Sequence, residues 1–158
     1  MRSLIKKILI VLGVALVAIQ FFPSAKNVST AAPGPNDITV MHPTSPEVKA
    51  ILKESCYDCH SNNTRYPWYT HIQPVGWWMQ HHVDEGNREL NFSEFGTYTA
   101  KRARKKLDEI VKETKDGEMP LTSFLITHRE AKLTALQIQQ VVDWADGIHA
   151  RIPAPAAP

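Results

Sequence analysis

Both cysteines of the chain lie in one short stretch, C-Y-D-C-H, which contains Cys56, Cys59 and His60. Thiols three residues apart lie on one side of a helical turn, with the histidine directly beside them. Four kinds of chemistry use such a group: covalent attachment of haem, a structural zinc ion, a redox dithiol and a plain disulfide. The rest of the sequence ranks these four alternatives.

Three of the alternatives find less support in the sequence. A structural zinc ion takes four ligands, but the chain has no further cysteine, and among its other histidines only His81 and His82 are closely spaced. A thioredoxin-like dithiol needs a βαβ context, whereas the periodicity here is helical. A disulfide stays open, because two cysteines in an oxidising compartment can pair. We favour covalent haem c, bonded to Cys56 and Cys59, with His60 on the iron.

A second iron ligand is predicted in the stretch D-G-E-M-P, where Met119 stands in a tight loop after a helix. Thioether sulfur is a soft ligand that suits haem iron and raises its reduction potential. Filling a gap in the core is the alternative role for Met119. If Met119 does not bind the iron, the candidates that remain are His71, His81, His82 and Met79.

Arg65, Tyr66 and Trp68 follow the histidine closely, in the stretch T-R-Y-P-W-Y. We expect them to contact the haem, either by bonding its propionates or by forming a wall of its pocket. A backbone carbonyl at Pro67 or Pro74 is expected to accept the ring N–H of His60. Ordinary aromatic packing is the alternative for these side chains.

Helices are predicted to position these residues, since the apolar residues recur at helical spacing and no alternating strand stands out. Ser45 and Pro46 indicate one helix start, Gly86 and Gly117 indicate two helix ends, and Thr134 with Gln137 forms a capping box. The fold class is therefore all-α, a small domain with long loops. Its helices are expected over residues 45–57, 74–85, 99–116 and 134–149.

The N-terminus differs from the rest, because Arg2, Lys6 and Lys7 precede an apolar run from Ile8 to Phe22. This pattern predicts a signal anchor or transmembrane helix over 1–22, with a cleaved export signal as the alternative. It would place the domain on the periplasmic side of a bacterial inner membrane. A flexible linker (23–39), a haem-binding domain (40–150) and a disordered tail (151–158) are expected to follow.

The charge balance gives no indication of nucleic acid binding. The chain has 18 basic and 16 acidic residues, and without the three N-terminal cations 15 basic residues face 16 acidic ones. The remaining basic feature is the run K-R-A-R-K-K at 101–106. It is interpreted as a solvated helix face, or alternatively as a docking patch for an acidic redox partner.

Residues 40 to 148 are similar to the small bacterial haem-binding domain family, on C-Y-D-C-H-S-N-N-T-R-Y-P-W-Y, N-R-E-L-N-F-S-E-F and G-E-M-P. A helix before C-x-x-C-H, a later Met-Pro and a C-terminal helix also resemble class I cytochrome c. The resemblance implies a membrane-anchored or exported protein with one haem. It defines the biological role poorly.

Electron transfer to redox partner proteins is the function that this pattern favours, and the protein is expected to be an electron carrier rather than an enzyme. Two axial ligands would leave the iron no open position. A peroxidase-type enzyme is the first alternative, which needs an open distal site and an acid–base group there. A haem-based redox sensor or an accessory subunit of a larger complex is the second.

Overall fold

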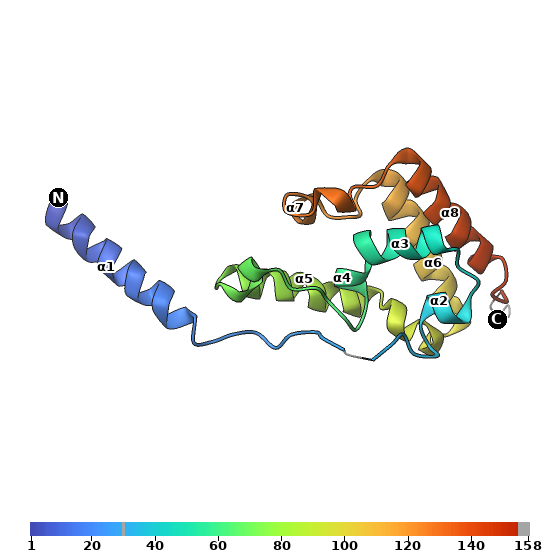
Figure 1. Ribbon diagram of the computed structural model, residues 1–158, viewed down its shortest axis with the longest axis horizontal. Coiled ribbons are helices and arrows are strands. Elements are labelled where there is room, and N and C mark those ends of the chain that lie inside the picture. The colour runs from blue at the N-terminus through green and yellow to red at the C-terminus, as the bar shows by residue number, and fades with distance from the viewer. Residues whose placement is uncertain (30, 155–158) are drawn as a thin grey trace.

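The computed structural model describes residues 1–29 and 31–154, and these ranges contain helices but no strand (Figure 1). The prediction of an all-α chain is confirmed. The long helices are α1 (Arg2–Ile19), α3 (Pro46–Ser55), α5 (Val75–Glu89), α6 (Ala100–Asp116) and α8 (Ala135–His149). Shorter elements connect them: α2 (Ile38–Met41), α4 (Tyr57–His60), α7 (Thr122–Leu125) and the 3-10 turns η1 (Trp68–His71), η2 (Phe92–Thr97) and η3 (Arg129–Ala131).

The predicted helix ends are largely confirmed. The Ser45 hydroxyl accepts the backbone N–H of Val48 in the first turn of α3, and Thr134 and Gln137 form both bonds of a capping box on α8. Gly117 ends α6 with a φ of 74°, in the left-handed region that favours glycine. Three helix boundaries are therefore predictable from hydrogen bonds and backbone angles within a few residues of each helix end.

Gly86 has a different role from the one predicted. Instead of ending a helix at residue 85, it lies inside α5, which continues to Glu89. A Cβ atom at this position would collide with the backbone carbonyl of Cys59. The glycine therefore allows α5 to approach the backbone of α4 closely.

The main core lies where α3, α6 and α8 pack together, with α2 and η2 closing one end. Trp144 of α8 belongs to this core, and its indole N–H donates to the Thr44 hydroxyl at 3.0 Å. The core consists of Ile38, Val48, Leu52, Leu90, Phe92, Phe95, Ala103, Leu107, Trp144, Ala145 and Ile148. Its position beside α4 means that the cysteine-containing turn is supported from one side by packed apolar residues.

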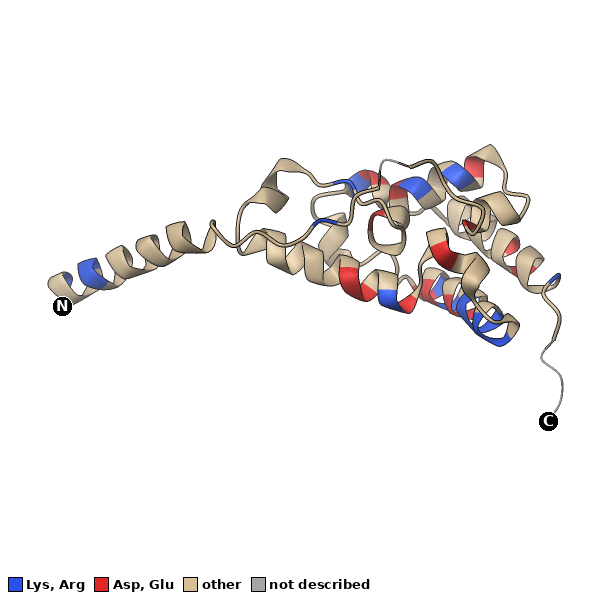
Figure 2. Ribbon diagram, turned by 90° about the horizontal axis from the view of Figure 1, so that it is seen from below, with Lys and Arg blue, Asp and Glu red and all other residues tan. Residues whose placement is uncertain are grey.

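The structure corrects the predicted membrane anchor. Helix α1 carries Arg2, Lys6 and Lys7 in its first turns and ends at Ile19 (Figure 2). Its uncharged part, residues 8–19, spans about 18 Å at ~1.5 Å per residue, against a hydrocarbon core of about 30 Å. Within the described ranges, no helix combines the length and the apolar character needed to cross a membrane. This finding overturns the predicted transmembrane helix and the inner-membrane anchoring drawn from it.

Specific hydrogen bonds join the segment after α1 to the domain. The side chain of Gln20 donates to the Gln73 carbonyl at 3.1 Å and accepts the Gln73 backbone N–H at 2.9 Å. The Asn27 side-chain amide donates to Ser61 and Thr64. Gln20 of the predicted anchor and Asn27 of the predicted linker therefore have fixed partners in the domain.

The C-terminal end of the chain is held by α6. Arg104 donates to the carbonyl oxygens of His149 and Ile152, at 2.9 and 2.8 Å. Within the predicted disordered tail, residues 155–158 lie outside the described residues, so the structure does not test that prediction there.

Candidate functional site

The C-x-x-C-H segment forms the junction between α3 and the single turn α4. Cys56 caps both helices, and Cys59 and His60 form the end of α4. Both thiols are free and partly buried. Burial and the neighbouring thiol raise the pKa of Cys56 to about 12, while burial and Asp58 raise that of Cys59 to about 11. Both thiols are therefore protonated at neutral pH.

The His60 ring is held by two backbone carbonyls at the C-terminal end of α5. Its Nδ1 atom lies 3.0 Å from the Gly86 oxygen and 2.9 Å from the Leu90 oxygen. Because carbonyls only accept hydrogen bonds, Nδ1 carries the proton and Nε2 is the nitrogen available for a metal. Burial is the largest influence on this ring and lowers the pKa of His60, which favours the neutral, metal-binding form. The expected partners at Pro67 and Pro74 are replaced by Gly86 and Leu90.

A cavity with two lobes opens beside His60. One lobe, of about 400 Å³, lies between α4, α5 and α7, and the other, of about 300 Å³, extends toward α6 and α8. Cys56, His60 and Met119 line both lobes, so the two meet at these residues. Figure 1 shows α7 facing α5 across this region. Each lobe falls within the ~300–1,000 Å³ of cofactor-sized pockets.

Met119 reaches this cavity from the loop after α6. Its backbone N–H donates to the Glu113 carbonyl at 3.1 Å, directly after the left-handed turn at Gly117. The side chain is 37% exposed and lines both lobes rather than the packed core. The structure thus brings together two thiols, an imidazole and a thioether, a donor set that suits haem.

A model of a haem-binding domain family matches residues 14–147, which is most of the chain. The chain belongs to the haem-binding domain family. Haem is therefore its cofactor, and the donors around the cavity fit that cofactor. No curated protein and no solved structure matches the chain, so the resemblance to class I cytochrome c rests on the sequence motifs.

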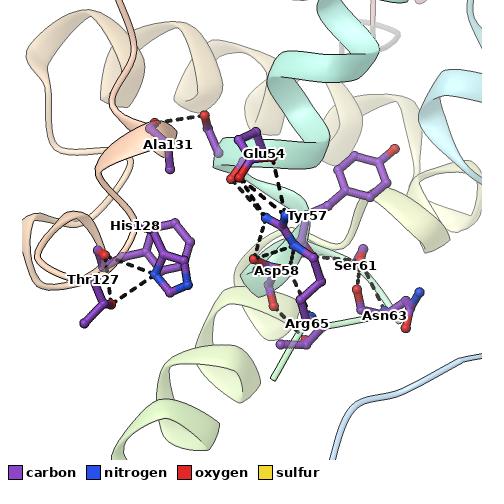
Figure 3. A network of polar contacts seen from close by, with 12 residues as sticks. Glu54, Tyr57, Asp58, Ser61, Asn63, Arg65, Thr127, His128 and Ala131 are labelled. Atoms are coloured by element: carbon purple, nitrogen blue, oxygen red, sulfur yellow. Dashed lines mark hydrogen bonds and ion pairs between the residues drawn. The ribbon is translucent and has the colours of Figure 1, made fainter. Parts of the chain in front are cut away.

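Arg65 lies outside the haem cavity. Its guanidinium binds the buried Asp58 carboxylate at 2.9 Å and Glu54 at 3.4 Å (Figure 3). Of these residues, Asp58 lines the lobe between α4, α5 and α7. Its backbone N–H also donates to Asp58 at 3.0 Å. These two carboxylates occupy the guanidinium, so the structure gives Arg65 a role in joining the turn after α4 to α3.

The two aromatic residues predicted beside the haem do not line the cavity either. The Tyr66 hydroxyl donates to the Gln80 side chain at 2.7 Å and accepts the Asn27 backbone N–H at 2.9 Å. Trp68 is 74% exposed and contacts the ring of Tyr69 edge-on. The turn after Ser61 directs these side chains toward the α1 linker and toward solvent.

Among the alternative iron ligands, His82 alone lines the cavity. His81 is exposed beside Glu85, Met79 is buried away from the cavity, and His71 contacts Lys26. His82 precedes Gly86 by one helical turn on α5, the helix that holds His60. It therefore lines the same lobe as His60.

Several residues of the site were missed by sequence reasoning. The carbonyls of Gly86 and Leu90 carry no sequence signal, because every residue has one. Phe124 lines the cavity and stacks on His128, with ring centroids 4.1 Å apart. Lys106 did give a signal, because it lies three residues after buried Ala103 on the apolar stripe of α6.

Proposed function

We propose that the protein is a mono-haem electron carrier in which Cys56 and Cys59 hold the haem covalently and His60 and Met119 bind its iron. One observation supports this most strongly. The His60 ring is fixed by two carbonyls at its Nδ1, while its Nε2 remains available beside a cavity that Met119 also lines. A ring oriented in this way is typical of a metal-binding histidine.

The two thiols carry out the attachment. Each S–H would add across one vinyl C=C bond of the haem, so that sulfur bonds to one carbon and hydrogen to the other, and no oxidant would be consumed. Cys56 and Cys59 are both protonated and line the cavity from one helical turn. They therefore lie on one side of the cofactor, next to the histidine that would orient it.

Two axial residues suit electron transfer better than reaction with a substrate. The haem supplies the one-electron couple of its iron. His60 and Met119 together would fill both axial positions, and a thioether ligand favours the reduced state. Met119 is partly exposed, so its side of the cavity is open to a redox partner protein.

The basic run at 101–106 is a poor docking patch for that partner. Arg102 lies over the Tyr98 ring at 4.0 Å, Arg104 binds the end of the chain after α8, and Lys106 is buried. Figure 2 shows the basic residues gathered over the first part of α6. Three of the five cations in this run therefore make contacts within the molecule. The other two, Lys101 and Lys105, face outward.

A peroxidase-type enzyme is the second candidate, because His82 lines the cavity and could act as an acid–base group. This reaction needs iron with an open position. It also needs His82 on the open side of the haem. His82, however, lies on α5, the same helix whose carbonyl groups hold His60.

Visible spectra of the wild type and of Met119→Ala test the proposal. We expect low-spin wild-type protein in both oxidation states and loss of the sulfur–iron charge-transfer band in the variant. Met79→Leu is the matched control, because Met79 is buried and its volume is conserved. A high-spin wild type that reacts with peroxide would reject the electron carrier in favour of the enzyme.

A further inference from the structure

Lys106 is a buried cation in the haem cavity that the proposed function does not use. Its residue surface is 8% exposed, and it lines the lobe that extends toward α6 and α8, together with His60 and Ile110. Its ammonium lies 2.7 Å from the Glu109 carboxylate on α6 and 3.1 Å from that of Glu89 on α5. An ammonium is rarely buried unless it is paired, and these carboxylates supply that pairing.

The charge state of Lys106 follows from these neighbours. Burial lowers the pKa of Lys106, but the hydrogen bonds that its ammonium donates to Glu109 and Glu89 outweigh this effect and raise it overall. The residue is therefore positive at neutral pH. An ammonium has three N–H donors, and the two carboxylates account for two of them.

The other cation among the described lining residues, Arg88, differs in its surroundings. Its side chain is exposed and pairs with Glu85 at the rim of the cavity. Glu89 also lines the cavity and is mostly exposed, so it can turn toward water at little cost. Lys106 is thus the cation placed to meet an anionic group inside the cavity.

We propose that Lys106 binds a propionate carboxylate of the haem. The inference rests on haem occupying this cavity, and it adds the residue that receives the anionic edge of the cofactor. The propionates are the anionic groups of haem, and an ammonium in a low-dielectric site is their natural partner. In this role Lys106 keeps the propionate ionised and adds positive charge near the iron, which favours the reduced state.

If Lys106 only holds α5 and α6 together, a different result is expected. In that case replacing Lys106 would change stability without changing how the reduction potential depends on pH. If Lys106 binds the propionate, its removal leaves a carboxylate in an apolar lobe, and burial raises the pKa of that carboxylate. The charged and titratable groups around Lys106 are Glu89 of α5, Glu109 and Glu113 of α6, and His60 of α4.

The test is the reduction potential of the haem-loaded protein between about pH 5 and pH 8, the range into which a buried carboxyl group is shifted. We expect a flat profile for the wild type. Lys106→Gln should show a lower potential near neutrality that falls as the pH rises, because the propionate then ionises within this range. Lys106→Arg should restore the flat profile.

Lys105→Gln is the matched control, since Lys105 is its exposed neighbour and also pairs with Glu109. A wild-type profile in Lys106→Gln would overturn the inference, and if that variant does not fold, Lys106→Met is measured in the same way. Haem content and the spectrum of the wild type report on the proposed function separately. Absence of the sulfur–iron band would reject Met119 as a ligand. The pH dependence of the reduction potential would still test whether Lys106 binds a propionate.

Discussion

The Nδ1 atom of His60 lies 3.0 Å from the carbonyl oxygen of Gly86, in the last turn of α5. The same glycine has no room for a Cβ atom, because the Cys59 carbonyl occupies that space. Close packing of α5 on α4 and the orientation of the His60 ring therefore depend on one small residue. Carbonyls at a helix C-terminus also carry partial negative charge, which increases the basicity of Nε2.

Gly86→Ala should separate α5 from α4. Because the added methyl group meets backbone rather than a flexible side chain, we expect about 1–3 kcal/mol loss in the free energy of unfolding. Haem content should fall as well, since the His60 ring loses its fixed orientation. Urea unfolding and the haem-to-protein ratio measure the two effects.

Gly147→Ala is the control for this substitution, because it lies in α8 with nothing near the added methyl group. It should raise stability by roughly 0.5–1 kcal/mol through helix propensity, with haem content unchanged. Equal changes in the free energy of unfolding and in haem content for the two alanine variants would contradict the role given to Gly86.

Arg65→Met should destabilise the fold without altering the haem spectrum. The substitution leaves the buried Asp58 carboxylate without its guanidinium, and since Arg65 is half exposed we expect a loss of about 1–3 kcal/mol. Thermal unfolding and visible spectra measure the two properties. Arg129→Met, at an exposed position, is the control. A changed reduction potential at unchanged stability would instead place Arg65 beside the haem.

Met119→Leu should keep the haem bound but change its electronic properties. Leucine fills a similar volume, yet it lacks the sulfur lone pair that binds iron. We expect a lower reduction potential, because the thioether ligand favours the reduced state. Voltammetry of both proteins measures the shift, and an unchanged potential would show that Met119 is only a wall of the cavity.

Acid should weaken the ion pair between Glu109 and Lys106 within α6. Burial raises the pKa of Glu109, but Lys106 and Lys105 outweigh it, and the net effect lowers it below the ordinary 4.5. A lowered folded-state pKa contributes stability above pH 4.5, which is lost as the pH falls through the folded value. Urea unfolding at pH 7 and below pH 4.5 should therefore show a smaller loss for Lys106→Gln than for the wild type. Lys101→Gln, at an exposed position, should behave as the wild type does.

The sequence predicted the features that depend on local chemistry. Ser45, Thr134 and Gly117 mark helix ends through bonds or backbone angles within a few residues, and the structure confirms each of them. The C-x-x-C-H motif and Met119 were also predicted from the sequence, because thiol, imidazole and thioether groups indicate haem binding by their type and spacing. The structure brings them to one cavity.

Features that depend on distant parts of the chain were less accessible. The direction of Arg65 follows from Asp58, which is buried by the turn after α4. Gly86 has the composition of a helix stop, and only its contact with Cys59 explains its place inside α5. The membrane anchor was predicted from an apolar run, but its helix ends at Ile19 and includes three cations.

The central claim is that Cys56 and Cys59 carry a covalent haem, and the intact mass of the denatured protein tests it most directly. We expect the wild type to weigh more than its chain by one haem, and the Cys56→Ser/Cys59→Ser variant to show the mass of the chain alone. Wild-type protein at the mass of the unmodified chain, or lighter by the two hydrogens lost in a disulfide, would contradict the claim.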